Sequence, residues 1–365
     1  MIGLRGIPSK DGGVEVAVGE LSPRLFELGI NCTVYCRSNY VDKNLNKYQN
    51  VSLISLPTIN TKHFEAFIHT FLSSIHAIGK RFDIIHYHAG GNALFCWLPR
   101  IFGLKTVVTL HGQDWQRAKW GGFAKFILRM GEKIGVIFAN NTISVSKKIV
   151  NYYPKYNLVH IPNGISNVVV EPDISILKDY ELDDYILYLG RIVPEKGIDI
   201  LIKAFIQNNM NEKLVIVGDT THTLNYLKEL KKISKYNKNI IFTGPLFNEK
   251  KEAIIKNAKL FIMPSLLEGM PIVLLEMLNA GIPCIVSDIP EIIEVVKVDD
   301  SNLCEIFKSG DIKDLSKKLI HVIADIGNYQ KKAFKSKAYV RKKYNWDSIA
   351  KETKDIYVNL MSQIK

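Results

Sequence analysis

Two loops in the second half of the chain carry charged residues at a spacing suited to binding an anion. The first is Gly190-Arg191-Ile192-Val193-Pro194-Glu195-Lys196-Gly197, which follows a short apolar run and precedes a helical pattern. A guanidinium and an ammonium five residues apart on such a turn can converge on a diphosphate, Arg191 through two hydrogen bonds and Lys196 as a point charge. Alone, such a pair is most often a solvated loop, so it does not decide the function.

A second loop, from Glu268 to Glu276, follows the apolar run Leu260 to Met263. Pro271 suits the first turn of a helix, so the backbone around Gly269-Met270-Pro271-Ile272 would form a helix N-terminus that attracts anions. Glu276 would lie about one and a half turns inside that helix, where a carboxylate can accept two neighbouring hydroxyls such as those of a ribose. Glu268 would lie in the loop, free to meet a sugar. The alternatives are a helix cap for Glu268 and an exposed helix face for Glu276.

A glycine-rich loop near the start of the sequence is a weaker signal. It runs from Arg5 to Glu15, and its Gly12-Gly13 pair lets backbone approach a phosphate or an acceptor closely where a helix begins. A simple turn is the commoner explanation of two adjacent glycines. The apolar stretch before the loop, Met1 to Leu4, is too short for a full strand, so we expect a truncated first strand.

A polar cluster follows the apolar run Thr106 to Leu110. His111 and Asp114 would lie just past the carboxyl end of this strand, while His86 and His88 end the preceding strand and should share one of its faces. A lone histidine at such a place is more often structural than catalytic. A metal site built on these histidines would need a third ligand that the pattern does not supply, so no metal is predicted.

The elements that position these residues alternate between strands and helices. Strands are expected at 33–35, 51–56, 84–87, 106–110, 142–145 and 158–161, and again at 185–189, 214–217, 240–242, 260–263 and 284–286. The pattern breaks between Pro162 and Asp184. Two successive alternations predict an α/β chain of two Rossmann-like domains with parallel sheets. Ligands of such chains bind beyond the carboxyl ends of the strands, and the cleft between the two domains is the favoured place.

Helical patterns supply the remaining expectations. Two of them run from about Asp311 to the C-terminus, and Trp346 opens the second. An earlier helix, at about 62–80, carries an apolar stripe at three- and four-residue steps, made of Phe64, Phe67, Ile68, Phe71, Leu72, Ile75 and Ile78. Such a stripe predicts a helix face that is buried in the core.

Composition narrows the class of protein. A hydrophobic content of 47% in 365 residues is enough for two cores, and no apolar run is long enough to span a membrane or ordered like a secretory signal, so a cytoplasmic protein is expected. Five scattered cysteines, an odd number, fit core thiols in a reducing compartment. The net charge of +12 favours anionic partners, and because no nucleic-acid motif is present we expect no nucleic-acid partner.

Taken together, these motifs resemble the family 4 retaining glycosyltransferases of the GT-B fold. The Gly-Arg-x4-Lys-Gly loop at 190–197 and the Glu-x7-Glu element at 268–276 match that family's donor signature in order and spacing. Residues 5–8, 12–15 and 109–120 are similar to a subgroup of rhamnosyl- and related transferases of surface polysaccharide synthesis. The resemblance implies an acceptor-side domain at 1–165, a nucleotide-sugar-binding domain at 184–345 facing it across a cleft, and a C-terminal helix at 346–365 that crosses back.

The resemblance also assigns roles. It implies that Arg191 and Lys196 bind the donor diphosphate, Glu276 the ribose and Glu268 the transferred sugar, while Gly190 and the segment Gly269 to Ile272 line the donor site. It further implies that Gly13 lies near the phosphate or the acceptor, and His111 near the reacting centre. No cofactor or metal is expected, because the cationic pair and the helix N-terminus neutralise charge. Retention by front-face displacement would let the leaving phosphate oxygen take the acceptor proton, so Glu268 is not expected to be a nucleophile.

The expected acceptor is a glycan or a lipid-linked sugar, and the expected place of action is the cytoplasm, peripheral on the inner face of the plasma membrane. Between Trp115 and Lys133, basic residues (Arg117, Lys119, Lys125, Arg129 and Lys133) interleave with aromatic ones, so this region would dock anionic lipid or a lipid-linked acceptor. A core helix with a solvated basic face is an equal alternative.

Other classes of protein stay open at this point. A nucleotide-sugar epimerase of the same fold would release altered or free sugar without transfer. A non-catalytic nucleotide-binding scaffold would bind without turnover. A dinucleotide-dependent oxidoreductase would need Gly-x-Gly-x-x-Gly after a strand and an acidic residue after the next strand, and the sequence shows neither.

Overall fold

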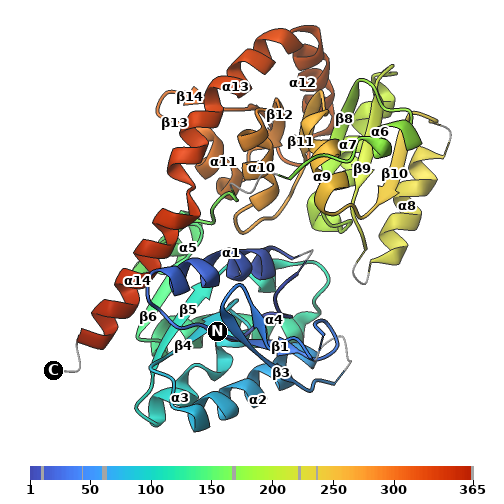
Figure 1. The fold of residues 1–365 in the computed structure, drawn as a ribbon. Coiled ribbons are helices and arrows are strands. Elements are labelled where there is room, and N and C mark those ends of the chain that lie inside the picture. Colours follow the sequence, from blue (N-terminus) through green and yellow to red (C-terminus); the bar gives the residue numbers. More distant parts are fainter. Residues whose placement is uncertain are drawn as a thin grey trace. The chain divides into compact units, whose positions relative to one another are not determined.

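The chain folds into two compact units (Figure 1). The structure, a computed structural model, describes residues 1–9, 12–42, 44–59, 64–166, 170–220, 223–235 and 237–362. Unit 1 comprises residues 1–166 and 344–365, and unit 2 comprises residues 167–343. Parts of three predicted segments lie outside the described residues, namely 10–11 of the glycine-rich loop, 62–63 of the helix expected at about 62–80, and 363–365 of the last helix.

Unit 1 is built on parallel strands at its centre. Its strands are β1 (Thr33–Arg37), β2 (Lys47–Tyr48), β3 (Val51–Leu56), β4 (Ile84–His88), β5 (Lys105–Leu110), β6 (Asn141–Ser144) and β7 (Leu158–His160). They form the orders β1-β3-β2, with only β2 antiparallel, and β4-β5-β6-β7. The short first strand is present as a single bridge between Ile2 and Tyr87. Backbone bonds from Ile2 N to His86 O and from Tyr35 N to Met1 O place this segment between β4 and β1.

Helices cover both faces of these strands. They are α1 (Gly13–Glu27), α2 (Glu65–Lys80), α3 (Trp97–Ile101), α4 (Gly122–Phe138), α5 (Lys147–Tyr152) and α14 (Trp346–Ser362), with short 3₁₀ turns η1 (Asn92–Phe95) and η2 (Asp114–Gln116). One core joins α1 and α14 to β1 and β3, and it contains Cys32 and Cys36, which are buried free thiols as predicted. A second core joins β4 and β5 to η1, α4 and α5. Trp346 opens the last helix, as predicted.

Unit 2 is built on a doubly wound sheet of six parallel strands. The order is β10-β9-β8-β11-β12-β15. Its strands are β8 (Tyr185–Leu189), β9 (Lys213–Val217), β10 (Ile240–Gly244), β11 (Leu260–Met263), β12 (Cys284–Ser287) and β15 (Glu305–Phe307), and a small antiparallel pair is formed by β13 (Lys297–Val298) and β14 (Ser301–Asn302). This is the 3-2-1-4-5-6 order of a Rossmann fold, which reverses direction between β8 and β11.

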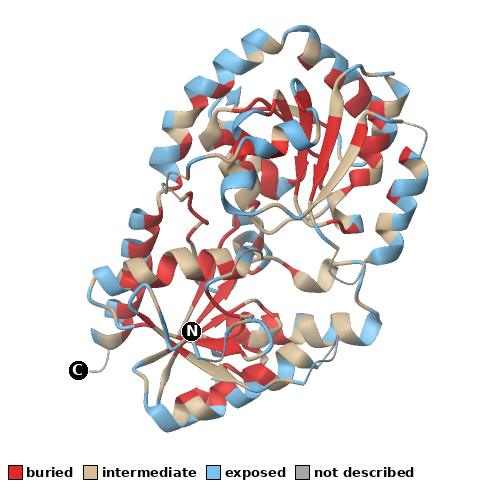
Figure 2. Cartoon of the chain, turned by 45° about the vertical axis from the view of Figure 1, so that its right-hand side comes forward, coloured by how far each residue is buried: buried red, intermediate tan, exposed pale blue. Residues whose placement is uncertain are grey.

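Most helices of unit 2 alternate with its strands. The helices are α6 (Ser175–Asp179), α7 (Ile198–Gln207), α8 (Leu224–Ser234), α9 (Asn248–Lys256), α10 (Ile272–Ala280), α11 (Pro290–Val296), α12 (Ile312–Ala324) and α13 (Ile326–Lys343), with η3 (Pro194–Lys196) before α7. Figure 2 shows the strands of both units buried beneath helices whose outer faces are exposed. Among the described residues, none of these helices or those of unit 1 is long and apolar enough to span a bilayer.

Two sequence-based predictions about helices are wrong. The segment from Asp311 onward contains three helices, α12, α13 and α14, where two were expected, because a break at Asp325 separates the first two. The apolar stripe of α2 is not in the core: Phe64, Phe67, Phe71, Leu72 and Ile75 are exposed, and the buried residues of this helix are His69, Thr70, Ser73, Ser74 and Ala77.

Candidate functional site

Two predicted anion-binding loops meet where the sheet of unit 2 reverses direction. The loop 190–197 follows β8, the loop 264–271 follows β11, and these strands are neighbours. Loops that leave adjacent strands toward opposite sides of a sheet open a ligand site at this point. Backbone bonding holds the two loops together, since the amide of Leu266 donates to the carbonyl of Glu195 at 2.8 Å.

Gly197 allows this close approach. Its φ of 62° lies in the left-handed region, and a Cβ at this position would lie 2.2 Å from the carbonyl oxygen of Pro264. Only glycine meets both demands without strain. The last residue of the Gly-Arg-x4-Lys-Gly motif therefore brings the backbone after β8 against the backbone after β11 and places Lys196 beside the second loop.

Lys196 and Glu268 pair with each other. Lys196 Nζ lies 2.5 Å from Glu268 Oε1, and Ser265 Oγ donates to the same oxygen at 2.7 Å. The sequence placed Glu268 free in its loop, and this is wrong, because both side chains are mostly buried and a buried carboxylate is stabilised by a cation and a donor. Neither does Glu268 cap the helix that follows, since α10 has no side-chain cap.

Arg191 follows strand β8 and is separated from it by Gly190. Its carbonyl accepts a hydrogen bond of 3.0 Å from the hydroxyl of Tyr188, which turns the backbone after Gly190. Burial raises the pKa of Tyr188 well above its usual value, with the negative charge of Glu268 acting in the same direction. The Tyr188 hydroxyl is therefore a fixed donor near the carboxylate and not a proton source at neutral pH.

The helix expected after Glu268 begins one residue later than predicted. α10 starts at Ile272, and Pro271 precedes it with its carbonyl accepting from the amide of Leu274 at 3.1 Å. The segment Gly269-Met270-Pro271-Ile272 thus leads into a helix N-terminus, where the amides of the first turn lack intrahelical partners.

Glu276 carries an unsatisfied acceptor. Its Oε1 receives a hydrogen bond from Lys251 Nζ at 2.8 Å, whereas its Oε2 is buried and has no hydrogen-bond partner among the described residues. Leu274 and Leu275 beside it on α10 are fully buried, as the sequence indicated. A buried carboxylate oxygen without a partner costs free energy, so its position suits a ligand that donates a hydroxyl.

Three histidines of unit 1 lie together, and two of them, His86 and His88, share one face of β4 as their spacing predicted. The rings of His86 and His88 stack with centroids 4.3 Å apart, and His88 Nδ1 lies 3.1 Å from His111 Nε2. His86 is held by the hydroxyl of Tyr357 at 2.5 Å and by Thr109 Oγ1 at 2.7 Å. Burial lowers the pKa of His111 to about 4 and those of His86 and His88 well below 6.5, so all three are neutral at physiological pH. Among the described residues, no group of three or more His, Cys, Asp or Glu side chains could hold a metal ion.

A carboxylate that the sequence did not single out lies in the same unit. Glu132 of α4 is buried and its Oε1 accepts from Tyr153 at 2.8 Å and from Trp115 Nε1 at 3.3 Å. Burial raises its pKa. Asp114, which the sequence places with His111 past the end of β5, forms an ion pair with Arg117 at 2.8 Å. The helical spacing gave no sign of Glu132, because a single acid in an amphipathic helix reads as part of its solvated face.

The glycine-rich loop ends where α1 begins. Gly12 precedes the helix with a φ of 93°, and a Cβ on Gly13 would meet nothing within 4 Å. Glu15 is buried, and its Oε1 accepts the backbone amide of Arg5 at 3.0 Å. The open space at Gly13 leaves the start of α1 accessible to a group from outside the chain.

Known families match both halves of the chain. The family described as "Glycosyl transferases group 1" matches residues 170–352, and "Glycosyltransferase Family 4" matches residues 11–167. The chain belongs to the group 1 glycosyltransferases. The matched regions of this glycosyltransferase contain the Lys196–Glu268 pair and the histidine cluster, respectively.

Individual relatives agree with this assignment. The glycosyltransferase is 28% identical over 304 residues to an uncharacterized glycosyltransferase, MJ1607, of Methanocaldococcus jannaschii, covering 76% of this chain and 75% of the relative. It is 24% identical over 305 residues to the O-antigen biosynthesis glycosyltransferase WclY of Escherichia coli, covering 78% and 81%. Among solved structures, Anabaena HepE in complex with UDP and glucose is similar, with a TM-score of 0.79 and 16% identity over 97% of this chain and 98% of that one. The two Rossmann-like units are thus those of the GT-B fold, and the enzyme transfers sugar in glycan synthesis.

Proposed function

We propose that this glycosyltransferase moves a sugar from a nucleotide-diphosphate sugar to a glycan or lipid-linked acceptor, with retention of anomeric configuration. The transfer would take place in the cytoplasm and would serve the synthesis of a cell-surface polysaccharide. The observation that carries the proposal is the meeting of the loops after β8 and β11, which brings Lys196 and Glu268 together at the switch point of a Rossmann sheet. The O-antigen biosynthesis role of the Escherichia coli relative supports the acceptor context, and the UDP and glucose bound to the Anabaena protein support the donor class.

The donor would be held by its charged and its hydroxylated parts. Arg191, Lys196 and the first turn of α10 would oppose the charge of the diphosphate. The unpartnered Oε2 of Glu276 would accept a ribose hydroxyl, and Glu268 would accept hydroxyls of the transferred sugar. Arg191 and Lys196 would stabilise the diphosphate as the bond to the sugar breaks.

The bond changes balance without a protein nucleophile. The acceptor oxygen forms the new bond to the anomeric carbon on the face that the diphosphate leaves. The leaving phosphate oxygen takes the acceptor's proton, so the products are the glycosylated acceptor and a nucleoside diphosphate. Neutral His111 would orient groups at this centre and would not act as a general acid, because its pKa of about 4 leaves it unprotonated.

The test is a screen of UDP-, GDP- and dTDP-sugars by thermal shift and saturation-transfer NMR. One nucleotide class should stabilise the protein, and the combined Arg191→Ala and Lys196→Ala variant should lose that stabilisation. The shift is measured against the variant's own ligand-free melting temperature, because removing Lys196 leaves the buried Glu268 without its cation. Product analysis with the active donor should show transfer with an unchanged anomeric configuration. Donor binding that survives in the combined variant would refute the proposed site, and release of an epimerised sugar without transfer would refute the reaction.

A further inference from the structure

Helix α2 is amphipathic in the reverse of the usual sense. A surface helix of a protein surrounded by water turns its apolar stripe to the core. In α2 the apolar stripe points outward and the polar one inward, and the helix is preceded by Phe64, which is also exposed. Isolated exposed apolar residues are ordinary, but a continuous stripe marks a surface that binds another apolar body.

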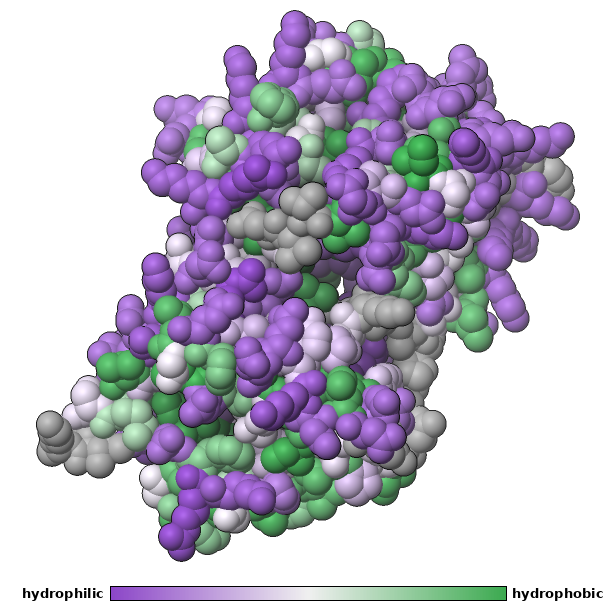
Figure 3. All heavy atoms as spheres, viewed as in Figure 1, coloured by the Kyte–Doolittle hydropathy of each residue, from purple (hydrophilic) through white to green (hydrophobic). Residues whose placement is uncertain are grey.

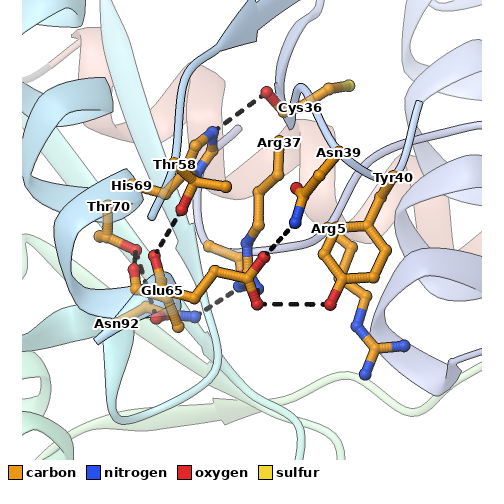
Figure 4. A network of polar contacts seen from close by, with 12 residues as sticks. Arg5, Cys36, Arg37, Asn39, Tyr40, Thr58, Glu65, His69, Thr70 and Asn92 are labelled. Atoms are coloured by element: carbon orange, nitrogen blue, oxygen red, sulfur yellow. Dashed lines mark hydrogen bonds and ion pairs between the residues drawn. The ribbon is translucent and has the colours of Figure 1, made fainter. Parts of the chain in front are cut away.

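The polar stripe of α2 is fixed inward by specific bonds (Figure 4). Glu65 pairs with Arg37 Nη1 at 3.3 Å and accepts from Asn39 Nδ2 at 2.7 Å. His69 Nε2 donates to the carbonyl of Cys36 at 3.1 Å, and farther along the helix Ser74 Oγ bonds the hydroxyl of Tyr87 at 2.8 Å. These contacts would be lost if α2 rotated, so the exposure of its apolar stripe is built into the fold.

The exposed stripe continues onto the neighbouring helices. The rings of Phe67 and Phe71 pack against Phe95 at centroid distances of 4.7 and 5.5 Å, and Arg100 Nη1 donates to the carbonyl of Phe138 at 2.6 Å, which ties α3 to the end of α4. We call the exposed apolar side chains on and next to these three helices the apolar face; they are Phe64, Phe67, Phe71, Leu72, Ile75, Trp97, Ile101, Phe102, Phe123, Phe126, Ile137 and Phe138. Figure 3 shows hydrophobic residues in green along the lower edge of unit 1, where α2 and α3 lie.

The outward-facing charged side chains of α2, α3 and α4 are all basic. Their only acidic residues are Glu65 and Glu132, and both are turned inward to partners described above. Their basic residues are Lys80, Arg100, Lys125, Arg129 and Lys133. A second copy of the chain would bring positive charge against positive charge at this face, which opposes self-association. An apolar stripe beside exposed basic residues complements an anionic lipid surface instead.

We propose that the apolar face lies on an anionic bilayer, with the aromatic and aliphatic side chains of α2, α3 and α4 in the headgroup and upper acyl region and their basic residues at the lipid phosphates. This surface extends the region first indicated by the sequence, 115–133, to two further helices. It does not depend on the donor site, because every residue that forms it belongs to unit 1.

The test is flotation of the full chain with vesicles of phosphatidylcholine alone and of phosphatidylcholine with phosphatidylglycerol. The chain should float with the anionic vesicles. The paired variant Ile75→Ser with Phe123→Ser should lower the partition coefficient at least about tenfold, since each side chain loses the transfer of a large apolar group. A matched control is Ile320→Ser with Phe334→Ser in unit 2, where exposure is similar: 47% and 80% in the first pair, 54% and 72% in the second.

A second pair of variants tests the charge. Lys125→Glu with Lys133→Glu should weaken binding to anionic vesicles by about fivefold or more per lysine, and added salt should do the same. Lys331→Glu with Lys335→Glu on α13 is the control that changes net charge equally. Melting curves and donor-induced thermal shifts should stay as in the parent chain, which separates this test from the donor site.

Several results would overturn the lipid assignment. They are equal flotation with neutral and anionic vesicles, no flotation at all, or equal loss in the apolar-face pair and its control. Sedimentation that shows a dimer of the parent chain, dissociated by Ile75→Ser with Phe123→Ser, would assign the apolar face to a second copy instead.

Discussion

Lys196 and Glu268, 72 residues apart in the sequence, form an ion pair with Nζ and Oε1 2.5 Å apart where the loops after β8 and β11 meet. The carboxylate also accepts from Ser265, whose carbonyl in turn accepts from Ser287 Oγ at 2.5 Å. The two charged groups are therefore positioned by the ends of three strands. A diphosphate that binds Lys196 has to share the ammonium with Glu268.

Removing either cation should slow the chemical step. Charge grows on the diphosphate as the bond to the sugar breaks, so contacts from Arg191 and Lys196 strengthen in the transition state. A charge-assisted bond is worth roughly 1.5 to 3 kcal/mol, so we expect kcat to fall about ten- to a hundredfold in Arg191→Ala and in Lys196→Ala. Steady-state kinetics at saturating donor measure this. Parental kcat in both variants would show that the diphosphate binds elsewhere.

The ion pair leads to a further prediction about how Glu268 affects the binding of a nucleoside diphosphate. In Lys196→Ala the carboxylate loses its cation and would repel the diphosphate. The double variant Lys196→Ala with Glu268→Gln removes that negative charge, so it should bind a nucleoside diphosphate more tightly than Lys196→Ala alone, as measured by calorimetry. Ser265→Ala serves as the control for loss of a neutral contact to the same oxygen. Additive effects of the two substitutions would mean that the pair does not act on the ligand jointly.

Glu276 should affect binding and not the chemical step. A ribose changes little during the reaction, so Glu276→Ala is expected to raise the donor KM about tenfold or more with kcat nearly unchanged. Lys251→Met is the matched variant, because it removes the partner of Oε1 and leaves the carboxylate in place. Its effect on KM should be smaller. A large fall in kcat for Glu276→Ala at an unchanged melting curve would contradict the ribose assignment.

Strand positions and site loops could be predicted because their signals are local. All eleven expected strands are present, including β8 and β11, since short β-branched runs between helical patterns leave few alternatives. His86 and His88 share a face because strand side chains alternate. Order along the chain and the parallel connections then fix which loops meet at the switch point.

Predictions that depend on partners distant in the sequence were wrong or absent. The stripe of α2 has the pattern of a core face, yet Arg37, Cys36 and Tyr87 bond its polar side and turn the apolar side outward. Glu268 was expected to be free in its loop, and its ion pair with Lys196 was missed because that partner lies 72 residues earlier. A helical period shows that a helix has two faces, but tertiary contacts decide which one is buried.

Gly197 should be intolerant of a side chain. Gly197→Ala has to accept a φ of 62° and also move the carbonyl of Pro264 away from a Cβ that would lie 2.2 Å from it. Gly281→Ala is a close control, because its φ of 80° carries the same backbone cost while the nearest heavy atom would be 3.7 Å away. We expect a loss of about 1 kcal/mol in the control and at least 1 to 2 kcal/mol more in Gly197→Ala, with weaker donor binding. Equal unfolding midpoints in urea would contradict this.

Turnover should not require a divalent cation. Arg191, Lys196 and the N-terminus of α10 would supply the positive charge that Mg²⁺ supplies in other nucleotide enzymes. Dialysis against EDTA should leave kcat within about twofold of its starting value. Activity that disappears after dialysis and returns with added Mg²⁺ or Mn²⁺ would show that the cationic side chains are insufficient.

The buried histidines should make unit 1 sensitive to acid. Burial lowers the pKa of His69 to about 4, and its Nδ1 has no hydrogen-bond partner among the described residues, so a proton there would leave a buried charge unpaired. The folded pKa lies below the unfolded value of 6.5. The neutral ring therefore adds to the free energy of unfolding above pH 6.5, and this contribution is lost as the pH falls from 6.5 toward 4.

Urea unfolding of the parent chain and of His69→Gln from pH 7.5 to 5 measures this contribution. Glutamine keeps a donor for the carbonyl of Cys36, which His69 Nε2 serves at 3.1 Å, but does not titrate. The free energy of unfolding of the parent should fall relative to the variant by roughly 2 kcal/mol between pH 6.5 and 5. His86 and His88 titrate in both proteins, so their effect cancels in the difference. A difference that stays constant over this range would show that His69 titrates normally and is not held neutral by burial.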